Sequence, residues 1–233
     1  MDGRRKRTIW ITVGAVVVVL GVTAAIAGPA VYRNSIAGEA EAVPTIAATR
    51  APSTLDPADL GGTWTVGTGS YAGYRVDEVL NGKPVTVTGR TGKVSGTATV
   101  SGSDITAATI TVDVASIATD SGNRDAYFRD SAMDAQAFPT ATFTTTEPIE
   151  DAVPSSGTAT TEQRVTGELE LHGVTRTVTA TIESGLSGNG ADVTGTIPIT
   201  FADYGVTAPS LGFVKVQERG SVEFLVHARP SGK

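Results

Sequence analysis

The chain has 233 residues, of which 40% are hydrophobic and only 18% are charged, and it contains no cysteine. The length suits one β domain with a targeting segment, and the lack of cysteine excludes disulfides, thiolate metal sites and thiol nucleophiles. The net charge is −6, and residues 1–7 are basic, so the rest of the chain is more acidic still. An acidic body argues against nucleic acid as a partner.

The N-terminal residues are expected to anchor the chain in a membrane. Residues 1–7 hold three arginines and one lysine and are expected to form a cytoplasmic tail. Twenty uncharged residues follow, from Thr8 to Ala27, which is the length of a helix that crosses the hydrocarbon core. We therefore predict a transmembrane helix, a signal anchor, over residues 8–30, with the remainder outside the cytoplasm by the positive-inside rule.

A cleaved signal peptide is the alternative for the same segment. Ala25-Ile26-Ala27 has the small-x-small pattern of a cleavage site. The apolar run is longer than the usual core of a signal peptide, which favours the retained anchor. Both interpretations export the domain, because cleavage would release it as a secreted protein.

A stalk and one folded domain are expected after the membrane segment. Residues 31–62 are rich in Ala, Pro and Thr and show no sustained apolar period, so they are predicted to be flexible. Residues 63–229 are expected to form the domain, and residues 230–233 a short tail. This division rests on the start of alternating apolar residues near Trp64.

Within residues 63–229 the dominant hydrophobic period is two. Val165, Gly167, Leu169 and Leu171 share one face, and similar sets occur near Val178, Ile197 and Phe224. Such alternation predicts half-buried antiparallel strands. About eight strands are expected, separated by turns that contain glycine, so the predicted fold class is all-β, an eight-stranded antiparallel barrel or else a sandwich. Residues 119–137 lack this period and are expected to form a short helical excursion across one end.

The sequence shows no arrangement typical of an enzyme. Neither of the two histidines has a partner at metal-ligand spacing, and no nucleophile elbow, phosphate-binding loop or dinucleotide fingerprint occurs. No catalytic residue, metal site or cofactor is therefore predicted. Arg124 and Asp125 are interpreted as structural residues that hold the helical segment to the barrel end through charge-assisted hydrogen bonds. Acid–base carboxylates or calcium ligands are the alternative interpretation of the aspartates in this segment.

The aromatic and aliphatic residues on the inward faces predict either a filled core or an apolar ligand pocket. An eight-stranded barrel is wide enough for one small ligand, and small inward residues such as Ala180 and Gly195 would leave room. Under the pocket interpretation, the lining residues are Trp64, Tyr74, Phe128, Phe138, Phe143, Leu169, Leu171, Ile197, Ile199, Phe201 and Phe224.

Three motifs resemble those of one known family. The first runs from Ser116 to Phe143 and contains Ser-Ile-x-Thr, Arg124-Asp125, a Phe-Arg pair and Phe-Pro139; the second is GELELHGVTRTVT, from Gly167 to Thr179; the third is Asp203-Tyr204-Gly205-Val206. Together they resemble the YceI-like lipid-binding proteins over about Trp64 to Arg229. The resemblance implies a lipocalin-like barrel, a polyisoprenoid ligand in some members, export, and structural positions at Arg124, Asp125, Pro139 and Gly173.

Two positions depart from the family pattern. Phe201 replaces a basic residue that usually stands two positions before the aspartate of the third motif, and Gly69 replaces a histidine. If those polar residues contact a ligand headgroup in the family, the resemblance implies a different headgroup or a purely apolar ligand here.

Together these observations predict a membrane-anchored, extracytoplasmic protein that holds an isoprenoid or similar long lipid and acts as a carrier, store or stress-related sensor. The first alternative is a filled-barrel structural or protein-interaction module without a ligand. A hydrolase is the remaining alternative, and it lacks a set of nucleophile, base and orienting residue.

Overall fold

The computed structural model describes residues 40–47, 51–56, 60–80, 82–153, 160–212 and 214–231. The predicted cytoplasmic tail and transmembrane helix lie outside these ranges. Across the described ranges, no helix combines the length and the apolar character that a membrane crossing needs.

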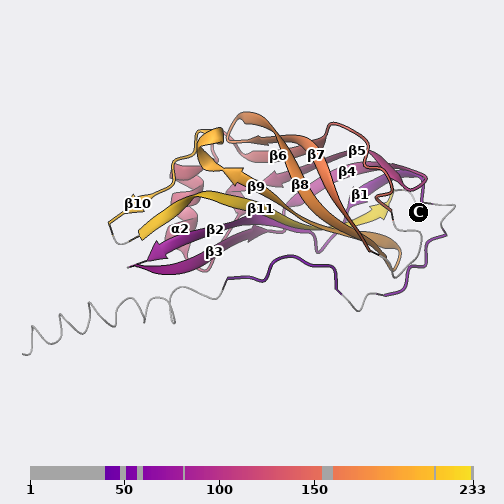
Figure 1. Ribbon diagram of the computed structural model, residues 1–233, viewed down its shortest axis with the longest axis horizontal. Helices are drawn as coiled ribbons and strands as arrows, with labels where there is room; N and C mark the ends of the chain where they lie inside the picture. The colour runs from indigo at the N-terminus through magenta and orange to yellow at the C-terminus, as the bar shows by residue number, and fades with distance from the viewer. Residues whose placement is uncertain are drawn as a thin grey trace, which may run out of the picture.

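The described chain is built almost entirely of antiparallel strands in one sheet (Figure 1). In chain order the strands are β1 (Gly62–Val66), β2 (Tyr71–Leu80), β3 (Lys83–Thr91), β4 (Val94–Ser101), β5 (Asp104–Asp113), β6 (Thr140–Thr145), β7 (Thr160–Leu171), β8 (Val174–Ser187), β9 (Gly190–Thr200), β10 (Ser210–Leu211) and β11 (Val214–Pro230).

Eight strands close a ring in the order β1-β4-β5-β6-β7-β8-β9-β11, and β11 pairs back with β1. β2 continues the line of β1 along the same edge of β11, and β3 pairs with β2 in line with β4. β1–β2 and β3–β4 are therefore two long strands, each broken in the middle. The predicted all-β, eight-stranded antiparallel barrel is confirmed.

The helical excursion is also confirmed, between β5 and β6. A 3-10 turn, η2 (Val114–Ser116), leads to α2 (Gly122–Tyr127) and then to one π-helical turn, η3 (Phe128–Ala132). The ring of Phe128 stacks on Tyr74 of β2 with centroids 4.8 Å apart, which packs η3 against the inner face of the sheet. A second 3-10 turn, η4 (Phe201–Tyr204), follows β9. The alternation of apolar residues had suggested that Phe201 extends strand β9. In the structure, Phe201 instead begins the turn.

Aromatic rings lie over inward-facing glycines of the barrel wall. A Cβ added at Gly195 would lie 2.5 Å from the ring of Phe224 and 2.8 Å from the carbonyl oxygen of Thr181. Tyr74, Phe143 and Phe201 approach glycines in the same way, at positions 89, 167 and 220. The expectation that Gly195 leaves room in the barrel is therefore wrong, because the Phe224 ring fills that space.

Two described stretches of the predicted stalk lie against the outside of the barrel. We call residues 40–47 the strap; it runs along β2 and β3 (Figure 1), and the N–H of Glu41 donates to the hydroxyl of Thr88 at 3.1 Å. Further on, the N–H of Thr54 donates to the carbonyl of Gly188 at 2.8 Å, at the β8–β9 turn. The sequence did not predict these contacts.

Candidate functional site

A cavity of about 300 Å³ opens beside β3. Three walls surround it: the strap, β3 itself, and the loop that leads into α2. The lining residues are Ala40, Glu41, Val85, Thr86, Val87, Thr88, Arg90, Ala118, Thr119, Asp120 and Arg124. In the described chain the outer edge of β3 meets this loop through one bridge, between Arg90 and Ala118.

The loop wall is held by hydrogen bonds within its own segment. Asp125 accepts from the N–H of Thr119 at 2.8 Å and from its hydroxyl at 2.7 Å. Arg124 forms an ion pair with Asp120. These bonds fix the loop to the first turn of α2, whereas the sequence interpretation had Arg124 and Asp125 bracing the segment against the barrel.

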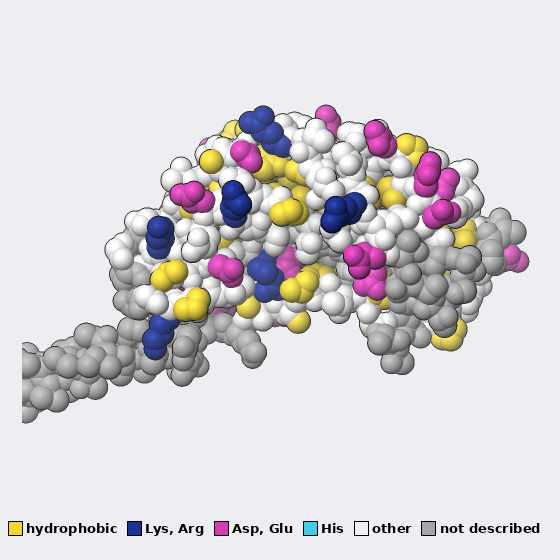
Figure 2. Space-filling model, in the orientation of Figure 1, with side chains coloured by type: hydrophobic (Ala, Val, Ile, Leu, Met, Phe, Trp, Pro, Cys, Tyr) yellow, Lys and Arg dark blue, Asp and Glu magenta, His cyan; other side chains and the backbone are white. Residues whose placement is uncertain are grey.

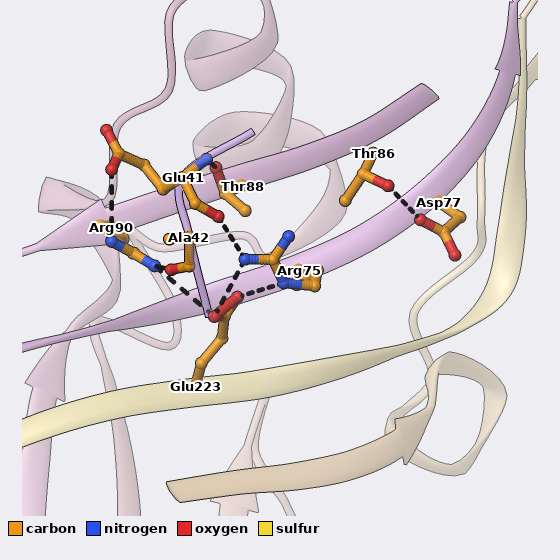
Figure 3. A network of polar contacts seen from close by, with 8 residues as sticks. All are labelled: Glu41, Ala42, Arg75, Asp77, Thr86, Thr88, Arg90 and Glu223. Carbon is orange, nitrogen blue, oxygen red and sulfur yellow. Dashed lines mark hydrogen bonds and ion pairs between the residues drawn. The ribbon is translucent and has the colours of Figure 1, made fainter. Parts of the chain in front are cut away.

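The outer face of the neighbouring strands carries a buried charged network (Figure 3). Glu223 of β11 is only 2% exposed, and its carboxylate lies 2.7 Å from Arg75 of β2 and 3.6 Å from Arg90 of β3. Both arginines also donate to backbone carbonyls of the strap, Arg75 to Glu41 and Arg90 to Ala42. The network therefore joins three strands and the strap.

The inner face of β2 carries two polar groups near the cavity. Burial raises the pKa of Tyr74 to about 12. The charge of Arg124 lowers this pKa and the charge of Asp125 raises it. Glu78 is 6% exposed. Burial raises the pKa of its carboxyl, and Arg124 acts in the opposite direction. Within the described structure we find no hydrogen bond or ion pair to this carboxyl.

Six of the predicted pocket residues meet in one apolar cluster inside the barrel. They are Phe143, Leu169, Leu171, Ile197, Ile199 and Phe224, together with the buried ring of Tyr204. Leu169 and Ile197 are buried, while Phe143, Ile199 and Phe224 remain partly exposed although they face inward. The barrel interior is therefore not completely closed to solvent.

The other predicted pocket residues lie elsewhere. Trp64 packs in a separate cluster with Leu60 and Leu186, and its indole N–H donates to the carbonyl of Leu60 at 2.8 Å. Phe128 and Tyr74 stack near α2. Phe138 packs edge-on against His172, with ring centroids 4.8 Å apart.

The two remaining motif residues have local structural contacts. The carbonyl of Pro139 accepts from the N–H of Val114 at 3.0 Å, which joins the two ends of the helical excursion. Gly173 has a φ of 72° in the β7–β8 turn, and the ring of Phe138 occupies the place where a Cβ would lie. Glycine is the residue that tolerates both conditions.

A family model for the YceI-like domain matches residues 64–228. The chain belongs to the YceI-like domain family. The resemblance drawn from the three motifs is thereby confirmed.

Two solved structures share the fold. A polyisoprenoid binding domain from Saccharophagus degradans, implicated in plant cell wall breakdown, aligns with a TM-score of 0.58 at 17% identity and covers 73% of this chain and 99% of that one. BcnA of Burkholderia cenocepacia aligns with a TM-score of 0.52 at 21% identity, over 66% and 95% of the two chains. At these identities the likeness establishes the fold. A search of curated proteins found no match.

Sequence reasoning missed Glu78 of this YceI-like barrel, although a signal was present. Glu78 occupies an inward position of β2. The other inward positions of this strand are Ala72, Tyr74, Val76 and Leu80. A charged residue at an inward position is the kind of exception that marks a site. The strap residues of the cavity gave no comparable signal.

One polar arrangement in the YceI-like domain resembles part of a hydrolase triad. Nδ1 of His227 lies 2.6 Å from Asp192. The nearby hydroxyl of Ser70 donates to the carbonyl of Gly67 at 2.8 Å and accepts from the backbone N–H of His227 at 3.0 Å. The Ser70 hydroxyl is therefore bonded to backbone and not to the imidazole, so it is not activated as a nucleophile.

Proposed function

We propose that this YceI-like protein is a membrane-anchored, extracytoplasmic binder of an isoprenoid or similar long lipid. The observation that carries the proposal is the inward apolar cluster whose side chains remain partly exposed, beside a cavity at the free edge of β3. A cavity of about 300 Å³ lies at the lower end of the range for ligand pockets. The polyisoprenoid binding domain from Saccharophagus degradans, which shares the fold, supports the same ligand class.

The energetics of lipid burial allow a useful affinity. Burying roughly ten methylene equivalents at about 0.8 kcal/mol each gives about 8 kcal/mol, which corresponds to roughly micromolar binding before ordering costs. The carrier, store and sensor roles all require reversible binding of this order.

The place where the strap meets the barrel supports a location close to the membrane. Ala40 lines the cavity, and the predicted transmembrane helix ends at residue 30. Ten residues span at most about 35 Å when fully extended. A retained anchor would therefore keep the cavity within a short distance of the bilayer, from which a lipid could enter.

The surface charge fits a lipid ligand better than a nucleic acid. On the face shown in Figure 2, acidic and basic side chains are interspersed, and Lys and Arg do not gather into an extended patch. Nucleic-acid affinity depends on such basic patches.

A filled-barrel interaction module is the second candidate function. The rings that cover the inward glycines favour it, because they fill space that a ligand would otherwise take. A bulky substitution at the cavity distinguishes the two functions. It should weaken lipid binding if the protein holds a lipid, and a filled-barrel module has no lipid binding to lose.

A titration with a fluorescent isoprenoid analogue tests the proposed ligand. Val85 lines the cavity, so Val85→Trp in the full-length chain should weaken binding by at least tenfold with little loss of stability. Thr177→Trp, on the exposed face of β8, is the matched control and should bind as the wild type does. A wild type that binds no analogue would favour the filled-barrel module.

Cysteine labelling tests the topology, since the chain has no native cysteine. A membrane-impermeant maleimide added to intact spheroplasts should label Thr179→Cys, on the exposed face of β8. Gly3→Cys, in the predicted cytoplasmic tail, should react only after lysis. Labelling of Gly3→Cys alone in intact spheroplasts would contradict the proposed orientation.

A further inference from the structure

Glu78 is a buried carboxyl on the inner face of the barrel, near residues that line the cavity. It lies opposite Val85 of β3, which lines the cavity, and opposite Val216 of β11. Arg124 and Asp120, which act electrostatically on its carboxyl, also line the cavity. The carboxyl therefore lies close to residues of the cavity wall, although Glu78 is not itself a lining residue.

The described chain forms no hydrogen bond with this carboxyl. It is 6% exposed, and in the described part of the chain it has neither a hydrogen bond nor an ion pair. Its oxygens are not among the fully enclosed polar atoms that lack a partner, so they keep some contact with solvent in the ligand-free protein. A ligand that donates a hydrogen bond would supply the missing partner.

The charges around the cavity disfavour an anionic ligand end. The two arginines in the lining are already paired, Arg124 with Asp120 and Arg90 with Glu41 and Glu223. Glu78 adds another carboxyl on the inner side. A phosphate or diphosphate placed here would meet like charge without a free cation to offset it.

Apolar side chains cover the inner face between Glu78 and the apolar cluster. From Glu78 the inward positions of β2 run through Val76 and Tyr74 to Ala72, which pairs with Phe224 of the apolar cluster. Six residues of strand extend about 20 Å. A long lipid with one end at Glu78 and its tail at the cluster would lie against these side chains.

We propose that Glu78 binds the polar end of the ligand by accepting a hydrogen bond from a neutral hydroxyl, and that the cavity rejects a phosphorylated end. The inference rests on the proposed function, since it specifies the headgroup of the lipid that the barrel holds. It places Glu78 as a specificity-determining residue for an uncharged prenol-like or phenol-like lipid.

Competition binding with three probes of the same chain length tests the inference. The probes are geranylgeraniol, its methyl ether and geranylgeranyl diphosphate. For each probe, the concentration needed to displace the fluorescent analogue from the full-length chain is measured. We expect the alcohol to bind about tenfold more tightly than the ether, as a hydrogen bond to a charged group allows, and the diphosphate to bind most weakly.

Variants assign the preference to Glu78. Glu78→Leu should bind the alcohol and the ether equally well, with the ether held at least as tightly as in the wild type. Asp77→Asn changes the neighbouring carboxylate on the exposed outer face and should keep the wild-type order. Glu78→Gln retains an oxygen acceptor without charge, so it should keep part of the preference for the alcohol and weaken the rejection of the diphosphate.

The outcomes separate the two proposals. Three results would overturn the role of Glu78 and leave the lipid-binding function standing. They are equal binding of the alcohol and the other probes, tightest binding of the diphosphate, and a preference for the alcohol that survives in Glu78→Leu. If Glu78→Leu does not fold, an unchanged order of affinities in Glu78→Gln would overturn that role equally. Absence of any binding of the fluorescent analogue to the wild type would refute both.

Discussion

Two buried glutamates on neighbouring strands of the barrel have opposite surroundings. Glu223 of β11 faces outward, is 2% exposed and lies between two arginines beneath the strap (Figure 3). Glu78 of β2 faces inward, is 6% exposed and has no partner among the described residues. The strands that carry them are directly hydrogen-bonded to each other.

The difference fits a structural role for Glu223 and the proposed binding role for Glu78. A buried ion pair with several charge-assisted hydrogen bonds holds segments together, and removing one partner is costly. The carboxyl of Glu78 makes no hydrogen bond that would hold segments of the free protein together. The first belongs to the attachment of the strap, and the second fits the recognition of a ligand.

The largest effect on stability is expected from breaking the outer network. Arg75→Met leaves Glu223 with one fewer partner and removes the bond to the strap carbonyl, so unfolding should become easier by about 3 kcal/mol. Lys215→Met, an exposed cation on β11, is the control and should change stability by less than about 0.5 kcal/mol. Denaturant unfolding measures both. Equal effects in the two variants would show that the network is not stabilising.

A slightly smaller effect is expected from adding bulk beneath an inner ring. Gly195→Ala places a Cβ against Phe224 and the backbone carbonyl of Thr181, and it should cost about 2 kcal/mol through overpacking. Gly122→Ala, at the start of α2 where a Cβ meets nothing within 4 Å, should be neutral or mildly stabilising. A stable Gly195→Ala protein, measured by thermal unfolding, would restore the idea of free space at this point of the barrel.

The inner glutamate should respond in the opposite direction to the outer network. At neutral pH, Glu78→Gln should stabilise the ligand-free protein by about 1 kcal/mol, since it removes a buried charge that lacks a partner. A loss of stability would mean that Glu78 has a partner in solution and would remove the contrast with Glu223.

The pH dependence sharpens the same contrast. Burial raises the pKa of Glu78 above its ordinary value of 4.5, with Arg124 lowering it and Asp120 raising it. Between the two pKa values the folded chain binds more protons than the unfolded chain, so wild-type stability falls as pH rises through that window. Glu78→Gln should lack this component, and the stability difference between the two proteins should grow as pH rises above 4.5.

The smallest effect is expected at the exposed contact between the strap and β3. Thr88→Val removes the acceptor of the Glu41 N–H and should cost about 0.5 kcal/mol. A cost of several kcal/mol, measured by denaturant unfolding, would show that the strap contributes much more to the fold than its hydrogen bonds indicate.

The alternating residues made the barrel predictable from the sequence, and the motifs made the family predictable. Period-two patterns such as Val165 to Leu171 fix which side chains face inward, because a strand has one buried face. The break in pattern after Asp113 likewise marked the helical excursion. Neither inference needed contacts between distant segments.

The cavity was not predictable because it depends on such contacts. Its walls come from the strap, β3 and the loop before α2, and the residues of the strap show no periodic pattern. The pairing of Glu223 with Arg75 and Arg90 joins positions far apart in the chain. The covering of Gly195 by Phe224 depends on strand register, which a single sequence does not specify. Glu78 could have been found from its inward position alone.

Mass spectrometry of lipid extracted from the purified full-length protein shows whether the barrel holds a lipid. We predict a lipid with a long apolar chain and an uncharged hydroxyl-bearing end, close to equimolar with the wild-type protein and strongly reduced in Val85→Trp. Thr177→Trp should carry as much lipid as the wild type. Absence of bound lipid from the wild type, or equal amounts in the wild type and Val85→Trp, would contradict the account.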